Sequence, residues 1–381
     1  MSSSQVEWGC SQCRSIITDH QKYCANCHSM LTWKCIGSGR SGLYKNVFRH
    51  RDNCIHCTSE IKDKPQGVEE KYIAIQQLQI LNNEQRPWSE WSRTNQSCVQ
   101  HTGHDIEQVH QLYSMCEQSL INYCLHRTKQ QSDNVNTISL SPMNLLVVTL
   151  WYLKHYHSER YIATEVYSSP STIHRILTDV VDILHSCVYE ELVSLPIDMD
   201  SRHTAHGPEE HHKLIVDTTS IAVPQPIDSK QRKAYFNSKS ATNYAFKVQI
   251  ACDFNYRIVH VSECYLGSVH DITILRESGL LEHVNDSVQI IGDKAYIGEE
   301  YVITSKKKPH RSELTTEEKD FNYNINSARA AIENINQRIK TYAVVGSVYR
   351  GAVDDFDKII KISQIVCALC NLNLIKHPIR K

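Results

Sequence analysis

The chain has 381 residues, of which 41% are hydrophobic and 22% charged, and its formal net charge is −1. That length and composition predict two or three domains with a sizeable core. The sequence has neither an apolar run of 18 residues nor an N-terminal hydrophobic signal segment, so we expect an intracellular protein without a membrane span. Because the chain has no overall basic excess, any binding of nucleic acid must depend on local basic patches.

Seven of the fifteen cysteines lie within residues 10–57. Two Cys-x2-Cys pairs separated by ten residues have the spacing of a tetrahedral zinc site, and a further set of one His and three Cys follows. The pattern predicts a zinc-binding module over residues 1–60 with about two structural zinc ions, held by Cys10, Cys13, Cys24 and Cys27 at one site and by Cys35, His50, Cys54 and Cys57 at the other. A reduced surface thiol cluster is the alternative. The other eight cysteines lie in apolar or helical contexts and are predicted to be small buried side chains.

The second half of this module carries four Lys or Arg residues between positions 40 and 51, with Tyr44 and Phe48 among them. This pattern suits a finger that contacts DNA phosphates, with Arg49 as one of the contacts. Zinc modules also bind proteins, which is the alternative function for this segment.

Residues 61–104 lack sustained periodicity and are predicted to be a linker with one short helix. Helical periodicity then extends over residues 105–196. Here RYIATEVYSSPSTIHRIL predicts one helix, a turn, and a second helix that Ser169 or Ser171 caps, with Pro170 at its start. A DNA-binding helix-turn-helix would place the first residues of the second helix in a groove, namely Ser171, Thr172, His174 and Arg175. A simple packing unit of two helices is the alternative.

Four acidic residues stand at the ends of apolar runs between residues 212 and 340. Asp217 and Asp293 each follow a short β-branched run, which predicts two buried strands with a carboxylate at the carboxyl end of each. Asp271 follows the turn GSVH and would open a helix. Glu333 lies in residues 327–342, where apolar residues recur with a period near 3.6 and predict a helix. Acids on strands and on a helix can converge on one point at such a sheet edge.

Converging carboxylates repel one another unless they share a proton or a cation neutralises them, and oxygen ligands without nearby His or Cys select Mg²⁺ or Mn²⁺. Two such ions can activate a water or a 3′-hydroxyl and stabilise the leaving oxygen in phosphoryl transfer. The alternative is that these aspartates serve only as turn and N-cap residues. Six histidines between residues 203 and 270 do not have the spacing of one tetrahedral site, and His211 and His212 are predicted to lie at the surface.

The blocks VDTT, GSVHDITILRES, GDKAY and RAAIENINQRIK occur in this order and resemble the DDE transposase domain of the PIF/Harbinger group and its bacterial insertion-sequence relatives. The last block fits the family's Arg-x3-Glu-x6-Lys signature with Arg329, Glu333 and Lys340. A tyrosine often stands three residues before that Arg, where this chain has Asn326. The resemblance implies an α/β protein, with a ribonuclease-H-like catalytic domain and a mixed sheet over residues 197–381, preceded by an all-α helix-turn-helix region and the small zinc-bound N-terminal module.

In that fold the first Asp lies on the first strand, the next follows the fourth strand, and the Glu lies on a later helix. Counting strands at 212–217, 244–252, 257–264 and 288–293 makes Asp217, Asp293 and Glu333 the expected catalytic ligands of Mg²⁺ or Mn²⁺. Asp271 is expected as a fourth member, because related domesticated proteins are described with all four acids. The resemblance also implies that Arg329 and Lys340 contact DNA phosphates, and the basic residues of SKKKPHR would add an electrostatic contact.

The resemblance implies a metal-dependent endonuclease that frees a 3′-hydroxyl at transposon ends and joins it to target DNA. It would act on double-stranded DNA as a homo-oligomer during synapsis, in the nucleus if the organism is eukaryotic, and a partner protein could supply DNA binding as it does in Harbinger elements. The alternatives are a domesticated descendant that keeps nuclease activity, a catalytically inactive zinc-finger DNA-binding protein derived from a transposase, and a restriction-type or repair-type nuclease with the same site.

Overall fold

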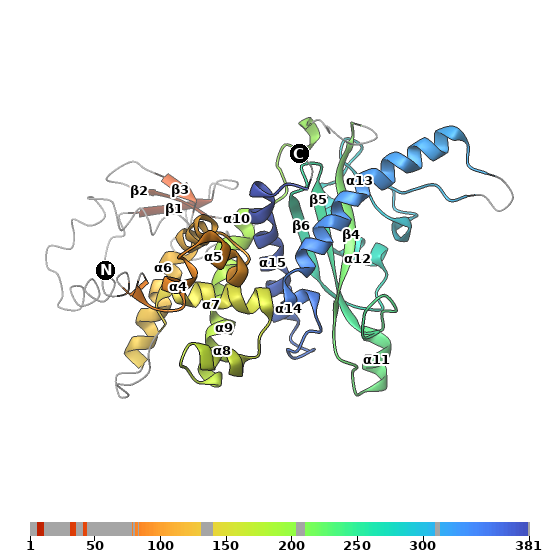
Figure 1. The fold of residues 1–381 in the computed structure, drawn as a ribbon. Coiled ribbons are helices and arrows are strands. Elements are labelled where there is room, and N and C mark those ends of the chain that lie inside the picture. Colours follow the sequence, from red (N-terminus) through yellow and green to blue (C-terminus); the bar gives the residue numbers. More distant parts are fainter. Residues whose placement is uncertain are drawn as a thin grey trace. The chain divides into compact units, whose positions relative to one another are not determined.

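The computed structural model describes residues 6–10, 31–35, 41–43, 78, 81–82, 84–130, 140–202, 210–308 and 313–379 (Figure 1). The chain divides into two compact units, Met1–Ile75 and Gln76–Lys381. The second unit contains both the helical region and the large sheet, so these two parts pack together as one body.

The first unit contains a three-stranded antiparallel sheet in the order β1 (Val6–Cys10), β2 (Leu31–Cys35) and β3 (Ser41–Leu43). The register pairs Val6 with Cys35 and Cys10 with Leu31. Cys10 and Cys35 therefore stand at opposite ends of the ladder, about 13 Å apart along the strands at ~3.3 Å per residue. The other six expected zinc ligands and Arg49 lie outside the described residues.

The helical part of the second unit is built around one apolar helix, α7 (Pro142–His155), which is buried from Pro142 to Leu153. A helix that is apolar on all sides has to be covered on all sides, and its neighbours supply that cover. These neighbours include α5 (Asn95–Thr102), α6 (Ile106–Gln130) and α9 (Pro170–Leu184), and the region also contains α4 (Trp88–Trp91), α8 (Glu159–Glu165), η2 (His185–Tyr189), α10 (Glu190–Leu192) and η3 (Met199–Ser201).

The structure differs from the expected linker over residues 61–104. Helices α4 and α5 fall within that range and pack against α7. Trp88 and Cys98 from these helices are buried in the main core. Their apolar positions are too sparse to give a periodic pattern, so burial by tertiary neighbours, not local propensity, forms these helices.

Serine caps begin three of these helices. The side chains of Ser141, Ser158 and Ser169 each accept a hydrogen bond from the backbone N–H three residues further on. Pro170 occupies the first position of α9, where its missing N–H costs nothing. The predicted pair of helices around the SSP turn is therefore present as α8 and α9, which pack on each other, and Ser169 is the residue that caps the second.

The sheet of the second unit has five strands in the order β6-β5-β4-β7-β8. The long strands β4 (His212–Ala222), β5 (Ala245–Asp253) and β6 (Ile258–Leu266) pair antiparallel, whereas β7 (Gln289–Ile291) and β8 (Val302–Ile303) run parallel to β4. The four strands expected from the sequence are thus present, in a mixed sheet, and the short fourth strand lies beside the first.

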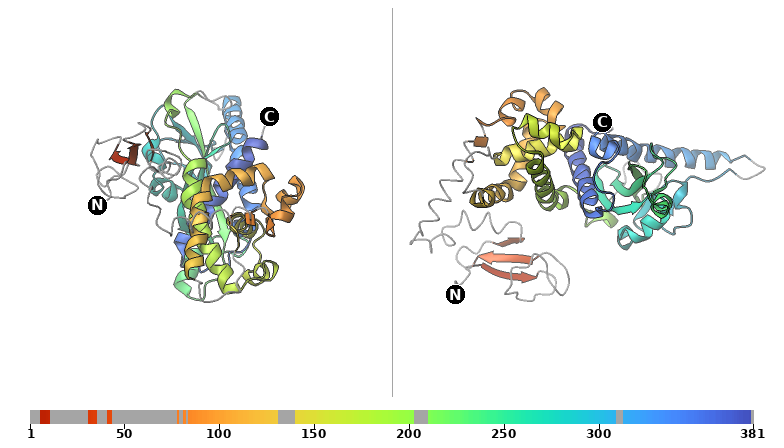
Figure 2. Two further views of the ribbon diagram at one scale, coloured as in Figure 1. Left: turned by 90° about the vertical axis from the view of Figure 1, so that its left-hand side faces the viewer. Right: turned by 90° about the horizontal axis from the view of Figure 1, so that it is seen from below.

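Helices cover both faces of this sheet (Figure 2). On one face, the side chains of Thr219, Ile221, Val248 and Ile250 meet α13 (Thr316–Lys340), α14 (Ala343–Gly346) and α15 (Phe356–Lys376). On the other, Leu214 and Val216 pack with Leu275 of α12 (Asp271–Glu277) and with Tyr296. The remaining elements are α11 (Ser229–Tyr235), η4 (Leu280–His283) and η5 (Lys294–Tyr296).

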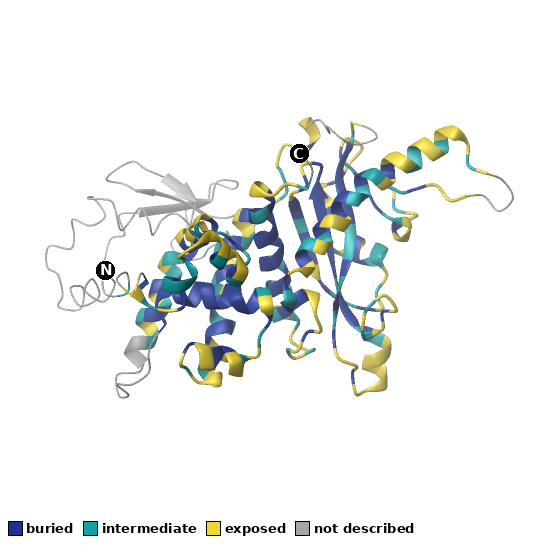
Figure 3. Cartoon of the chain, in the orientation of Figure 1, coloured by how far each residue is buried: buried dark blue, intermediate teal, exposed yellow. Residues whose placement is uncertain are grey.

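Helix α13 begins at Thr316, well before the expected residue 327, and extends beyond the sheet (Figures 1 and 2). The reason is a capping box, in which the Thr315 side chain accepts from the Glu318 backbone N–H and the Glu318 side chain accepts from the Thr315 backbone N–H. The first half of this helix is largely exposed (Figure 3), so no apolar stripe marks it in the sequence.

Burial agrees with the sequence for the cysteines and differs for one histidine. Among the eight cysteines outside residues 10–57, Cys187 is half-buried and the other seven are buried. His212 was predicted at the surface but is only 1% exposed, because it lies on β4 beside β7. Within the described residues, α15 is the one helix long and apolar enough to cross a membrane, and 67% of its apolar window is buried inside this unit, as in a core helix.

Candidate active site

Asp217 lies in the middle of β4, on the face of the sheet that α13 covers. Side chains alternate along a strand, and Thr219 and Ile221 of the same face pack under α13 to α15. From α13, Asn336 Nδ2 donates a hydrogen bond of 2.8 Å to Asp217 Oδ2. The other amide atom, Asn336 Oδ1, is buried and has no hydrogen-bond partner among the described residues. This oxygen is thus a second acceptor beside the carboxylate.

The environment of Asp217 disfavours its charged form. Burial raises the pKa of this carboxyl group to about 6, and repulsion from Asp293 and Asp271 contributes in the same direction. The Thr218 backbone N–H and the positive charge of Arg329 act the other way. A buried acid near other acids is an arrangement that a divalent cation would stabilise.

Asp293 directly follows β7 and Gly292, beside β4. The parallel register pairs Ile215 with Ile291, so Asp217 and Asp293 stand two residues further along each chain. Asp293 Oδ1 accepts a hydrogen bond of 2.7 Å from the Ala295 N–H and so caps the short helix η5. Topology therefore places the carboxyl end of β7, with Asp293, beside the middle of β4, and repulsion from Asp293 contributes to the raised pKa of Asp217.

Tyr296 anchors the turn that carries Asp293. Its ring is fully buried, and its hydroxyl is 3.0 Å from Thr218 Oγ1 and 3.1 Å from Gln249 Nε2. A Cβ at Gly292 would lie 2.8 Å from the Tyr296 ring, so this glycine permits the close approach. The tyrosine of the motif GDKAY therefore fixes the turn by hydrogen bonding to β4 and β5, a role that the sequence alone did not predict.

Asp271 lies at the start of α12 and is already neutralised by a protein partner. Its Oδ1 is 2.9 Å from Lys247 Nζ, and the two side chains are only 16% and 15% exposed. Lys247 pairs with Ser220 across β4 and β5. By the alternation of side chains, it lies on the face opposite to Asp217, together with Gln249 and Thr218.

Glu333 lies on the exposed part of α13, one turn before Asn336. Its side chain is 58% exposed, and its carboxylate is 3.6 Å from the guanidinium of Arg329. Arg329 itself is only 19% exposed, and its Nε is buried without a hydrogen-bond partner among the described residues. Arg329, which was expected to contact DNA phosphate, is therefore a largely buried cation whose charge acts on both Asp217 and Glu333.

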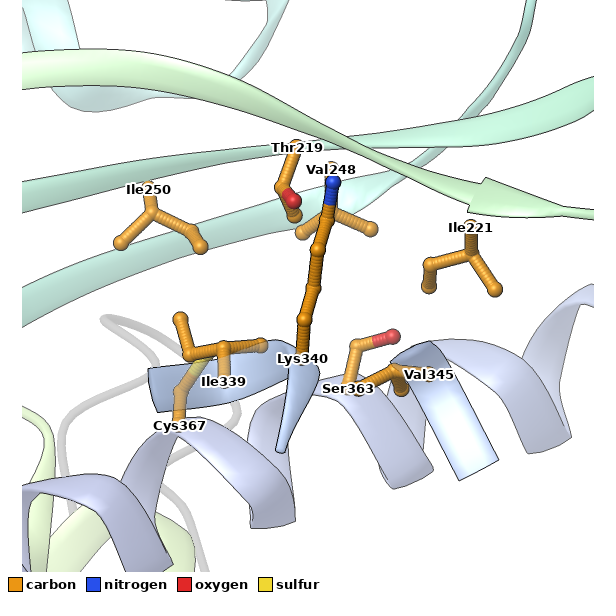
Figure 4. Close-up of a pocket in the computed structure, with 9 residues that line it drawn as sticks. All are labelled: Thr219, Ile221, Val248, Ile250, Ile339, Lys340, Val345, Ser363 and Cys367. Carbon is orange, nitrogen blue, oxygen red and sulfur yellow. The ribbon is translucent and has the colours of Figure 1, made fainter. Parts of the chain in front are cut away.

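Lys340, the other expected phosphate contact, ends α13 and covers apolar surface with its stem. A cavity of about 10 Å³ lies between α13, α15 and the sheet, lined by Thr219, Val248, Ile339 and Lys340 among others. Figure 4 shows the Lys340 side chain running from the helix end toward the strands. An alkyl stem on apolar surface with its ammonium group outside is usual for lysine.

Asn326, at the position where the resemblance leads us to expect a tyrosine, makes a hydrogen bond within the protein. Its Oδ1 accepts a hydrogen bond of 2.9 Å from Ser305 Oγ. One turn earlier, Asn322 exchanges hydrogen bonds with the backbone of Lys306. These two asparagines hold the segment after β8 along α13.

The first residues of α9 are exposed, as groove contact would require. Ser171, His174 and Arg175 are exposed and Thr172 is half-buried. His174 Nδ1 is 2.9 Å from Glu159 Oε1 of α8, so this side chain already has a partner. It also lines a cleft of about 780 Å³ between α8, α9 and residues 349–358.

The donor types at the acidic site fit a hard divalent cation, but their positions do not form a complete shell. In the parts of the chain that the structure describes, no three side chains of His, Cys, Asp or Glu lie close enough together to hold a metal ion. Instead, Asn336, Ala295, Lys247 and Arg329 engage the four acids one by one. Three carboxylates and the free oxygen of Asn336 have the chemistry that Mg²⁺ or Mn²⁺ prefers.

Comparison with known proteins relates this region to nucleases. Residues 216–371 match the family described as DDE superfamily endonuclease. Over 210 residues, 54% of this chain, it is 24% identical to a protein of Microchaete diplosiphon described as a probable transposase for insertion sequence element IS702, and the match covers 71% of that protein. The matched family segment includes all four acids discussed above. These findings make residues 216–371 similar to DDE superfamily endonuclease domains, and the chain similar to a transposase of an insertion sequence.

Proposed function

We propose that this protein is a divalent-metal-dependent DNA endonuclease and strand-transfer enzyme that acts at transposon ends, or a domesticated descendant that keeps the nuclease. The observation that carries the proposal is the parallel pairing of β4 with β7, whose register gives Asp217 and Asp293 matching positions in neighbouring segments, with Asn336 of α13 bonded to Asp217. This β6-β5-β4-β7-β8 order also supports a ribonuclease-H-like fold. Membership of the PIF/Harbinger group is proposed from the four sequence blocks alone.

In this proposal Asp217, Asp293 and Glu333 hold two ions of Mg²⁺ or Mn²⁺, with Asp271 as a further member of the acidic group. When bound, the ions would activate the attacking hydroxyl and stabilise the leaving oxygen. Asn336 orients Asp217 through its hydrogen bond. Arg329 lies 3.6 Å from Glu333, and its positive charge also lowers the pKa of Asp217. Such supporting contacts fix the direction of carboxylate lone pairs.

DNA would be held by separate parts of the chain. We propose that Arg329, Lys340 and the basic residues 306–308 contact phosphates, that the first turn of α9 enters a groove, and that the zinc module contributes further contacts. Two transposon ends have to be brought together, so the active form would be at least a dimer, in the nucleus of a eukaryotic cell. A partner DNA-binding protein is compatible with the same chemistry.

The test is metal-dependent cleavage of a plasmid that carries the DNA flanking the gene, in which terminal inverted repeats are expected. Wild-type protein should cleave at the repeats with Mg²⁺ or Mn²⁺ and leave 3′-hydroxyl ends. Glu333→Gln should keep DNA binding and lose cleavage by orders of magnitude, because it removes a metal ligand. The matched control is Glu300→Gln, an exposed glutamate outside the site, which should cleave normally. Cleavage that survives Glu333→Gln would contradict the assignment.

A second candidate is a catalytically inactive DNA-binding protein derived from a transposase. It is favoured by one observation, namely that the described acids have protein partners and do not converge as a metal cluster. The two candidates separate in the same assay, since the inactive protein would bind the flanking DNA and cleave nothing with either metal.

A further inference from the structure

The connection between β4 and β5 is much longer than the strand pairing needs. The two strands pair up to Ala222 and Ala245, where a short turn could join them. Instead, residues 223–244 form α11 and an ordered loop. The loop is closed by hydrogen bonds of 3.0 Å from Val223 N to Tyr244 O and 2.9 Å from Asn237 N to Asn243 O.

Helix α11 is fixed to the body of the second unit. The Tyr235 side chain is buried, and its hydroxyl donates a hydrogen bond of 2.8 Å to the Val353 carbonyl. The backbone of Gly267 lies so close that a Cβ there would be 2.4 Å from the Tyr235 carbonyl oxygen. At the other end, the Asp228 side chain caps the helix by accepting from two backbone N–H groups. Hydrogen bonds and packing therefore fix this segment to the rest of the second unit.

This segment carries a set of exposed cations that have no carboxylate partner among the residues the structure describes. We define the α11 surface as Lys230, Arg232, Lys233 and Lys239, all of which are exposed. The segment 223–244 contains these four basic residues and one acid, Asp228, giving four minus one, or +3, against −1 for the whole chain. None of the four forms an ion pair with a carboxylate in the described parts of the chain, and Asp228 is occupied at the helix cap.

Several other exposed cations of the second unit are paired. Arg86, Arg202 and Arg276 lie 2.6 Å, 2.9 Å and 2.7 Å from the carboxylates of Glu90, Asp198 and Glu299. Next to these cations, Phe236 is 51% exposed, and most of α11, from Ser229 to Lys233, is exposed (Figure 3). A cluster of unpaired positive charges on a fixed element can bind the regularly spaced negative charges of a polyanion.

We propose that the α11 surface binds the phosphate backbone of duplex DNA beside the acidic site, an inference that rests on the proposed nuclease function. The strand β4 connects the two places, since Asp217 and Ala222 lie five residues apart on it, roughly 17 Å at ~3.3 Å per residue. A duplex presents one phosphate per strand about every 3.4 Å along its axis. The α11 surface would thus contact phosphates about five base pairs or more from the cleaved bond.

The experiment measures binding of full-length protein to a fluorescein-labelled duplex of mixed sequence, about 30 base pairs long, by anisotropy in EDTA. The test variant is Lys230→Ala/Arg232→Ala/Lys233→Ala. The control is Arg86→Ala/Arg202→Ala/Arg276→Ala, which removes the same charge from paired positions. Each phosphate contact contributes about −0.9 to the slope of log K against log salt. We expect the magnitude of this slope to decrease by about 2 to 3 in the test variant and to stay unchanged in the control.

An unchanged slope in the test variant, or an equal loss in the control, would overturn the inference. Lys239→Glu, a single change on an exposed loop residue, should weaken binding several-fold and gives a reading that does not depend on the helix staying folded. The nuclease proposal is tested independently, by plasmid cleavage with Mg²⁺ or Mn²⁺. A chain that shows the α11-dependent slope but never cleaves refutes the nuclease and leaves the phosphate contact standing.

Discussion

Replacing Asp217 by Asn should stabilise the metal-free protein, and the gain should depend on pH. Burial, together with repulsion from Asp293 and Asp271, raises the pKa of Asp217 from 3.8 to about 6. The folded state therefore binds more protons than the unfolded state between these values, so stability falls as pH rises through that window and the full cost is present above pH 6. At 1.36 kcal/mol per pKa unit, the cost is about 3 kcal/mol. Asn cannot ionise, but its oxygen can still accept the hydrogen bond from Asn336.

The measurement is urea unfolding in EDTA, followed by circular dichroism. At pH 7.5, Asp217→Asn should be more stable than wild type by about 3 kcal/mol, and at pH 4 by about 0.5 kcal/mol. Asp286→Asn is the matched control, because Asp286 is exposed and the change should be neutral at both values. Added Mg²⁺ should then narrow the difference, since it stabilises only a protein that binds it. A gain of the same size at both pH values would refute the electrostatic origin, and a loss at pH 7.5 would refute the unfavourable environment of the carboxylate.

Three further outcomes are expected. Asp293→Ala should abolish cleavage. Asp271→Ala should lower cleavage by only about 10–100-fold, because Asp271 is paired with Lys247 and acts from outside the ligand set. The measurement is plasmid cleavage by both variants at equal protein concentration, and equal losses of activity would make Asp271 a direct ligand. Asn336→Leu should weaken Mn²⁺ binding by about 10–100-fold in isothermal titration calorimetry, since Asp217 loses its orienting donor, and unchanged affinity would show that the hydrogen bond is only structural. Elemental analysis of the full-length protein should find about two zinc ions per chain, and one or none would rule out the two-site module.

The sequence was sufficient to predict the elements whose apolar residues form long regular patterns. The strands β4, β5 and β6 are such cases, because their burial imposes a pattern on the residues themselves. Short β7 was also predictable, since it is a run of β-branched residues ending in a turn. The order of strands, which places β7 beside β4, came from the resemblance and not from any local pattern.

What the sequence did not predict depends on contacts between distant residues. Helices α4 and α5 were missed because Trp88 and Cys98 are buried by α7, about fifty residues further along the chain. The early start of α13 was missed because its cap lies outside the apolar stripe. The ion pair of Asp271 joins residues on different elements, and no spacing in the sequence indicates that Lys247 would reach it.

The alternation of side chains along β4 helps to decide which aspartate would bind metal together with Asp217. Asp217 shares its face with Thr219 and Ile221 and meets α13, the helix that carries Glu333. Lys247, the partner of Asp271, shares the opposite face with Thr218. Asp293 follows β7, which runs parallel to β4, and the register gives it a position matching that of Asp217 on the neighbouring strand. For Asp271 to join Asp217 as a metal ligand, it would have to leave Lys247, whose ammonium group would then keep the neutral Val269 carbonyl but lose its carboxylate partner. We therefore propose Asp293 as the ligand and Asp271 as a nearby charge, which raises the pKa of Asp217 from outside the ligand set.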